Sequence, residues 1–134
     1  MKLNWENRFN TGVRSIDLQH QELVQIINAL DSLEMTVATE KSLKQLLVQL
    51  NHYVIFHFNH EEDLMHRHFI PMEKRSSHLD QHANFQKQIE VATKTLLAAS
   101  DPNAKRVLVD FLQHWLLEHI MVADMEVARH IKLK

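Results

Sequence analysis

Apolar residues recur at steps of three and four through most of this chain, and this spacing restricts the fold more than any other feature. Side chains spaced in this way lie on one face of an α-helix, whereas a half-buried strand would alternate at every second residue. Four such faces follow one another, and their outermost members are Ile16 and Leu30, Leu43 and Met65, His78 and Leu96, and Leu108 and Val122. Glycine and proline, which disfavour helix, contribute only one and two of the 134 residues. The sequence therefore predicts an all-α protein.

Capping residues and prolines indicate where the four helices begin and end. The candidate N-terminal caps of the first, third and fourth helices are Ser15 or Asp17, Ser76 or Ser77, and Asp101 followed by Pro102. An irregular N-terminal arm should end near Arg14. The second helix is expected from about Thr39 to His68, because Pro71 opposes its continuation. The third helix should end near Ser100.

The lengths of the helices and of their connections predict the architecture. Helices of roughly 20–28 residues joined by short connections pack as antiparallel neighbours. We therefore expect an up-down-up-down antiparallel four-helix bundle with an N-terminal arm. A chain of 134 residues has the usual size of one domain, so residues 1–134 are expected to form a single domain.

Charge and composition exclude several classes of partner. The chain has 15 basic and 17 acidic residues and a formal charge of −2, so it should bind neither nucleic acid nor an anionic membrane surface. It has no signal-peptide pattern and no apolar stretch of about 20 residues, so we expect no membrane insertion and a cytoplasmic location. Because cysteine is absent, any metal must be bound by imidazole and carboxylate groups.

Eleven histidines are the unusual part of the composition, and they could be metal ligands, surface residues or core residues with one satisfied ring nitrogen. At about 100° per residue, five of them and one glutamate fall within the apolar faces. These six residues are His20, His57, Glu61, His78, His82 and His119. The other histidines are His52, His60, His66 and His114, which fall off the faces, His68, which is borderline, and His130, near the end of the last helix. All four helices therefore contribute inward polar groups.

Two of the inward pairs have the spacing of metal ligands. His57 and Glu61, and likewise His78 and His82, are four residues apart, which places each pair side by side on its helix. This spacing alone is a weak signal, because two other pairs have it on faces expected to be solvated, namely Glu62 with His66 and His114 with Glu118. The inward groups, however, meet at one level of an antiparallel bundle. Burying them without partners would cost roughly 1–3 kcal/mol for each neutral group and more for a charge, so we interpret them as a metal site rather than as hydrogen-bonded core histidines.

Further residues complete a pattern that covers nearly the whole chain. Its members are Trp5, Gly12-Val13, Ile16-Asp17, Gln19-His20, His57-Phe58, Glu61-Glu62, Leu64-Met65, His78, His82, Trp115-Leu116, His119-Ile120 and Asp124. This pattern resembles that of the hemerythrin family, in particular its single-domain bacterial members. The resemblance implies two non-haem iron ions that cycle between Fe(II) and Fe(III) and share an oxo or hydroxo bridge. The ligands that it implies are His78, His82 and His119 on one iron, His20 and His57 on the other, and Glu61 and Asp124 bridging both.

Asp124 is nominated by the resemblance alone. It follows His119 by five residues, which in a regular α-helix rotates it about 140° away from that histidine. A local π-bulge or a distorted turn, both frequent at functional sites, could bring it inward. The site therefore predicts an irregularity in the last helix.

The implied ligand set would leave one coordination position free, on the iron that has only His20 and His57, and this suits a diatomic ligand. The resemblance implies that the residues around this position are Phe58, Trp115, Leu116 and Ile120. These side chains would form a dry lining that leaves little room for an organic substrate.

We therefore interpret the chain as a protein that binds dioxygen reversibly for transport, storage or delivery, and not as an enzyme. Its site is rich in histidine, whereas oxygen-activating di-iron enzymes in helical bundles use mostly carboxylates. Two other interpretations stay open: a module that senses dioxygen or nitric oxide through an unidentified protein partner, and an oxygen-activating di-iron enzyme. A purely structural metal site is a third.

Overall fold

The computed structural model describes residues 2–99 and 101–132, and four long helical segments account for most of them. Three are uninterrupted: α1 (Arg14–Ser32), α2 (Glu40–Arg67) and α3 (Met72–Ala99). The fourth consists of α4 (Pro102–Glu118), a π-helix, η3 (His119–Asp124), and α5 (Met125–Lys132). Short 3₁₀ turns occur at η1 (Asn7–Phe9) and η2 (Val37–Thr39), and no strand occurs within the described ranges.

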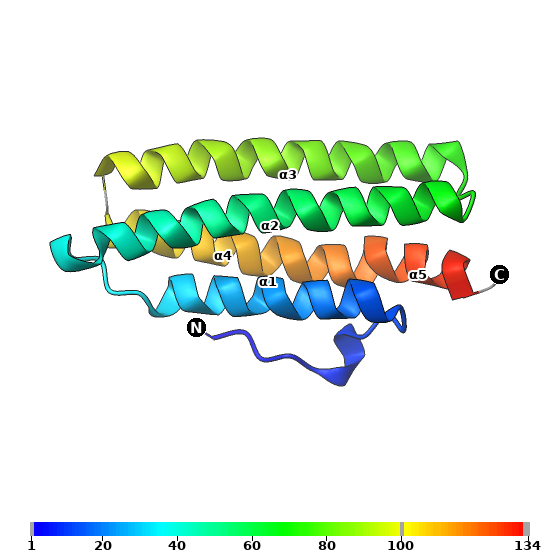
Figure 1. The fold of residues 1–134 in the computed structure, drawn as a ribbon, viewed down its shortest axis with the longest axis horizontal. Helices are drawn as coiled ribbons and strands as arrows, with labels where there is room; N and C mark the ends of the chain where they lie inside the picture. The colour runs from blue at the N-terminus through cyan, green and yellow to red at the C-terminus, as the bar shows by residue number, and fades with distance from the viewer. Residues whose placement is uncertain (1, 100, 133–134) are drawn as a thin grey trace.

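The helices lie side by side, and successive helices run in opposite directions (Figure 1). The N-terminal arm runs back along α1 before that helix begins. The prediction of an all-α four-helix bundle is therefore confirmed. No helix among the described residues is both long and apolar enough to cross a membrane.

The start of α1 differs from the prediction. Its N-cap residue is Val13, which makes no side-chain capping bond, so Ser15 and Asp17 lie inside the first turn and neither is the cap. The Asp17 carboxylate instead accepts hydrogen bonds from the Thr11 amide and hydroxyl, both at 2.7 Å, and from the Gly12 amide at 3.1 Å. Gly12 has φ +89°, a left-handed conformation that favours glycine. Asp17 therefore orders the arm rather than the end of the helix.

The connection between α2 and α3 is tighter than the sequence suggested. The second helix ends at Arg67, close to the predicted His68, and α3 begins at Met72, directly after Pro71. Ser76 and Ser77 are therefore interior helical residues, and the predicted cap is wrong. The fixed φ of proline suits the entry to a helix, and the amide of Arg75 donates to the Pro71 carbonyl at 3.0 Å.

The predicted start of the fourth helix is confirmed. Asp101 is the N-cap, its carboxylate accepts from the Asn103 amide at 3.0 Å, and Pro102 is the first helical residue. The predicted end of the third helix near Ser100 lies outside the described residues. Lys105 then donates to the carbonyl oxygens of Asp31 at 2.8 Å and Leu33 at 2.7 Å, which joins the start of α4 to the end of α1.

The apolar faces pack against one another in one long core. Its fully buried members include Ile16, Leu30, Leu47, Leu50, Phe58, Ile89, Leu96 and Leu112. A smaller cluster of Met65, Ile70 and Val127 closes the end of the bundle near the α2–α3 connection. Val122 is an exception to the predicted fourth face, because it is 63% exposed.

Candidate metal centre

The six polar residues that the sequence placed on the apolar faces, together with Asp124, meet inside the bundle. Each of the seven residues is at most 4% exposed. They come from α1 (His20), α2 (His57 and Glu61), α3 (His78 and His82) and η3 (His119 and Asp124). The expected off-face histidines His52, His66 and His114 are exposed, whereas His60, His68 and His130 are half-buried.

Asp124 lies between histidines from three segments. One carboxylate oxygen, Oδ2, is 2.6 Å from His20 Nε2. The other, Oδ1, is 2.9 Å from His119 Nε2 and 3.2 Å from His78 Nε2. This carboxylate therefore reaches imidazoles of α1, α3 and η3 at once, which is the position that a bridging ligand requires.

Glu61 occupies the equivalent position on the other side. Its Oε1 is 2.5 Å from His57 Nε2 and 3.6 Å from His119 Nε2, and its Oε2 is 3.0 Å from His78 Nε2. His82 completes the cluster, with Nε2 3.3 Å from His119 Nε2. The Nε2 atoms and the two carboxylates thus point at a common interior.

The π-helix explains how Asp124 enters this interior. The amide of Met125 bonds to the carbonyl of Ile120, five residues earlier, instead of the four of an α-helix. Residues five apart therefore lie one above the other, which brings Asp124 below His119. The same extra residue turns Val122 outward, so the predicted buried position of Val122 is wrong. The distorted turn expected for Asp124 is present.

The charges inside the cluster strongly perturb the proton affinities of its members. Burial disfavours the charged forms of His57 and His119, but the neighbouring carboxylates outweigh it and raise the pKa of His57 to about 9 and that of His119 to about 10. Burial favours neutral Asp124 as well, yet the charge of His119 holds the pKa of this carboxyl well below its usual value. Burial and the charges of His119 and His78 lower the pKa of His82 to about 3. Without a metal, the carboxylates therefore favour the protonated forms of His57 and His119, and they raise the pKa of His78 as well.

The arrangement fits metal ions better than it fits a network of hydrogen bonds. Several buried polar atoms have no hydrogen-bond partner, and these include His57 Nε2, Glu61 Oε1 and Asp124 Oδ1. They face oppositely charged neighbours at short range but without the alignment of a hydrogen bond. Two groups of four residues have ligand atoms within 4.8 Å of one another: Glu61 with His78, His82 and His119, and Glu61 with His20, His57 and Asp124. These groups divide the histidines in the way that the resemblance implies, and the ligand assignment stays a prediction.

Two residues that the sequence did not single out as part of the site orient the imidazoles from outside. Gln19 Oε1 lies 2.8 Å from His57 Nδ1, and Glu62 Oε2 lies 3.0 Å from His82 Nδ1. A proton on each Nδ1 donates to these oxygens, which leaves each Nε2 lone pair directed at the centre. Glu62 was expected on a solvated face and is half-buried, so that expectation is wrong. The sequence signal that could have identified Glu62 as part of the site was its position directly after Glu61.

Two of the four residues expected to line the site, Phe58 and Trp115, stack on its imidazoles, and the lining by all four stays a prediction. Phe58 stacks on His82 with ring centroids 3.7 Å apart, and Trp115 stacks on His119 at 4.3 Å. Phe58, Trp115 and Leu116 also border a small apolar cavity of about 10 Å³, whereas Ile120 is fully buried and does not border it. The cavity has an entirely apolar lining, and two of its members, Leu23 and Val54, are three residues from His20 and His57.

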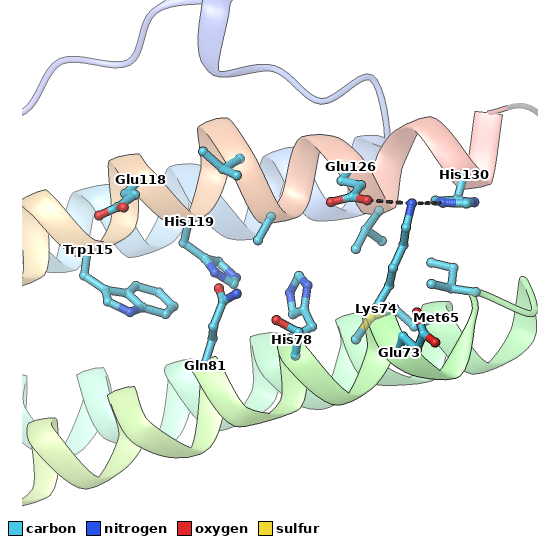
Figure 2. A pocket seen from close by; sticks show the side chains of 15 residues that line it. Met65, Glu73, Lys74, His78, Gln81, Trp115, Glu118, His119, Glu126 and His130 are labelled. Carbon is cyan, nitrogen blue, oxygen red and sulfur yellow. Dashed lines mark hydrogen bonds and ion pairs between the residues drawn. The ribbon is translucent and has the colours of Figure 1, made fainter.

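A larger pocket of about 480 Å³ lies on another side of the centre, between α3 and the α4–η3–α5 segment (Figure 2). His78 and His119 line it and point into the space between these elements. Its other lining residues include Trp115, Gln81, Glu73, Lys74, Glu118 and Glu126. The centre is therefore bordered by one apolar cavity and by one larger pocket whose lining is mixed, with charged side chains beside apolar ones such as Met65 and Val127.

Comparisons with known proteins agree with this geometry. A model of the hemerythrin HHE cation binding domain matches residues 11–131. The bacteriohemerythrin of Clostridium acetobutylicum is 29% identical over 125 residues, which cover 91% of this chain and 95% of that protein. A hemerythrin-like protein of Naegleria gruberi is 31% identical over 123 residues, which cover 92% of this chain and 88% of that protein. A bacteriohemerythrin of Stenotrophomonas maltophilia is 26% identical over 97% of this chain and 82% of its own length. This match over nearly the whole sequence shows that the chain belongs to the hemerythrin family.

Proposed function

We propose that the seven buried residues bind two non-haem iron ions and that the protein binds dioxygen reversibly. The observation that carries this proposal is the pair of four-residue ligand groups that share Glu61. One group has three histidines, whereas the other has only His20 and His57 beside its carboxylates. Asp124 Oδ1 also lies 2.9 Å from His119 Nε2, so if Glu61 and Asp124 both bridge, the second ion would have four protein ligands and the first would have five. An iron pair bound in this way would supply the electrons for reversible binding of dioxygen at the less coordinated ion.

The surroundings of His20 and His57 suit an apolar diatomic ligand. The apolar cavity begins one helical turn from both histidines, at Leu23 and Val54. Its volume of about 10 Å³ is at the lower limit for one water molecule, and its apolar walls give water no hydrogen-bond partner. Dioxygen needs no such partner. Leu116 and Phe58 would keep water away from the ligand and so favour its release unchanged.

Two kinds of experiment test this proposal. Metal analysis of protein reconstituted with Fe(II) should give two irons per chain, and a single zinc would contradict it. The absorption spectrum of the reduced, iron-loaded protein should change on exposure to air and return on degassing, with one dioxygen taken up per chain. A sensor of dioxygen or nitric oxide would also bind reversibly, but its ligand would change its association with a protein partner.

An oxygen-activating di-iron enzyme is the second candidate, and the 480 Å³ pocket favours it because the space is large enough for a small organic molecule. The pocket opens on His78 and His119, however, and these belong to the group with three histidines. A substrate there would lie away from the less coordinated ion. Consumption of many dioxygen molecules in the presence of a reductant and an organic substrate would replace the carrier proposal with the enzyme.

A further inference from the structure

The burial of the centre raises the question of how a metal ion reaches it. All seven residues are at most 4% exposed, so an ion from solution needs a route through the bundle or an opening of the helices. An ion in water carries a hydration shell, and losing it in an apolar passage is costly. The apolar cavity beside Leu23 and Val54 offers no carboxylate or imidazole to replace that water. It is therefore unsuitable for an ion.

The 480 Å³ pocket differs from the cavity because charged and polar side chains are part of its lining. At about 30 Å³ per water molecule, a divalent ion with six waters needs roughly 200 Å³, so it fits inside. Three carboxylates line the pocket: Glu73 from α3, Glu118 from α4 and Glu126 from α5. At its inner end are His78 and His119 (Figure 2).

A second observation at the inner end points to a ligand. The Nδ1 atom of His119 is buried and has no hydrogen-bond partner, although the side chain lines this polar pocket. His119 Nε2 already faces Glu61 and Asp124 inside the centre. The His119 imidazole thus stands between the pocket and the cluster, where an arriving ion would exchange water for protein ligands.

Lys74 opposes this negative lining, as does protonated His119 in the metal-free protein. Lys74 is the single lysine or arginine among the residues that line the pocket, and its Nζ lies 2.7 Å from Glu126 Oε1 and 3.2 Å from His130 Nε2. These contacts stretch Lys74 from α3 to α5 across the pocket (Figure 2). Its charge neutralises one of the three carboxylates and repels a cation.

We propose that this pocket is the route by which the divalent metal ion enters, with Glu73 and Glu118 attracting the hydrated cation and Lys74 slowing its passage. The proposal rests on the metal centre proposed above but not on dioxygen binding. The proposal gives the two spaces different roles: the pocket with the carboxylates admits the ion, and the apolar cavity, which has room for at most about one water molecule, borders the proposed dioxygen site.

The test measures how fast metal-free protein takes up Fe(II) without oxygen, at low ionic strength, by competition with a coloured chelator. Glu73→Gln and Glu118→Gln should each slow uptake about two- to fivefold, because each removes one attracting charge. Lys74→Met should accelerate uptake by a similar factor. All three variants should reach the iron content of the unaltered protein, and the differences should diminish in about 0.5 M salt.

A glutamate and a lysine elsewhere on α3, the helix of Glu73 and Lys74, provide the control. Glu90 and Lys94 form an exposed ion pair at 3.3 Å, and neither lines the pocket. Glu90→Gln and Lys94→Met therefore change the net charge in the same way and should leave the rate unchanged. Equal rates in the pocket variants and the control variants would overturn the entry route. Failure of every protein, including the unaltered one, to bind iron would overturn the proposed centre as well.

Discussion

At the scale of single residues, His57 and His82 are each held by the ring nitrogen that faces away from the centre. Gln19 and Glu62 bind these nitrogens at 2.8 and 3.0 Å. An imidazole restrained in this way presents its other nitrogen at a fixed position, so the ligand geometry exists before a metal arrives. This restraint applies to His57 and His82, whereas the Nδ1 atoms of His20 and His119 have no hydrogen-bond partner.

Replacement of inward and outward histidines should therefore have unequal effects. His57→Ala or His119→Ala should abolish the binding of at least one iron and destabilise the loaded protein by about 3–5 kcal/mol, because a buried carboxylate loses its partner. His66→Ala and His114→Ala, on exposed faces, should keep full iron content and unfold normally. Metal analysis and thermal unfolding of the four variants check this, and equal iron loss in both pairs would show that the face assignment is wrong.

At the scale of elements, η3 determines which residues of the last helical segment face inward. Its extra residue places Asp124 in the centre and Val122 in solvent, while Val127 returns to the apolar cluster with Met65. In a regular α-helix, Asp124, Val122 and Val127 could not take these three orientations at the same time. The π-helix is thus the local irregularity that brings Asp124 into the proposed metal site.

Substitution on either side of η3 tests this register. Val122→Ser should change the free energy of unfolding by less than about 0.5 kcal/mol, because the side chain is already exposed. Val127→Ser should cost about 2 kcal/mol, because it removes buried methyl groups and buries a hydroxyl. Urea unfolding measures both values. A larger cost at Val122 than at Val127 would favour an uninterrupted α-helix.

The elements also show what the sequence could and could not predict. Apolar periodicity identified the four helices and the inward histidines, because a 3.6-residue repeat is a property of the chain itself. Asp124 needed the family resemblance, since no periodicity anticipates a π turn. The cap of α3 was misplaced because Ser76 and Ser77 resemble caps while Pro71 had already set the start of that helix. Glu62 was overlooked because its partner, His82, lies on another helix.

At the scale of the whole molecule, the charges of the metal-free centre make its stability depend on pH. His57 and His119 have folded pKa values of about 9 and about 10, above the unfolded value near 6.5, so their contribution is complete below pH 6.5 and is lost as the pH rises toward 10. His82, with a pKa of about 3, has the opposite effect: the fold loses stability as the pH falls below 6.5. The metal-free protein should therefore be most stable near pH 6.5.

Thermal unfolding of metal-free protein between pH 5 and 10 measures this optimum. Iron should alter the profile, because it competes with the protons of His57 and His119, so its apparent affinity should rise with pH through this range. Stability of the metal-free protein that increased steadily up to pH 10 would contradict the ion pairs of His57 with Glu61 and of His119 with Asp124.

The apolar cavity should govern how long dioxygen remains bound unchanged. Leu116 is buried and lines that cavity, and Leu116→Ala would enlarge it enough to admit water. The oxygenated form should then decay to the oxidised protein about tenfold faster, with iron content unaltered. Absorption spectra recorded over time measure this rate, and Val109→Ala, at another buried position of α4, is the control. Equal rates in the two variants would show that general loosening of the core is responsible.

The contact between His20 and Asp124 has a consequence for the order in which the protein assembles. These residues are separated by 104 positions, so a metal held by both closes a loop that contains most of the chain. Closing such a loop in a flexible chain has an entropic cost that grows only slowly with its length. In a chain that is already folded into a bundle, the two residues are close together, so metal binding adds little further loss of entropy. During synthesis, His20, His57, Glu61, His78 and His82 emerge first, and the cage stays incomplete until Asp124 has followed. The centre should thus form at the end of folding, on a bundle held together by its apolar core.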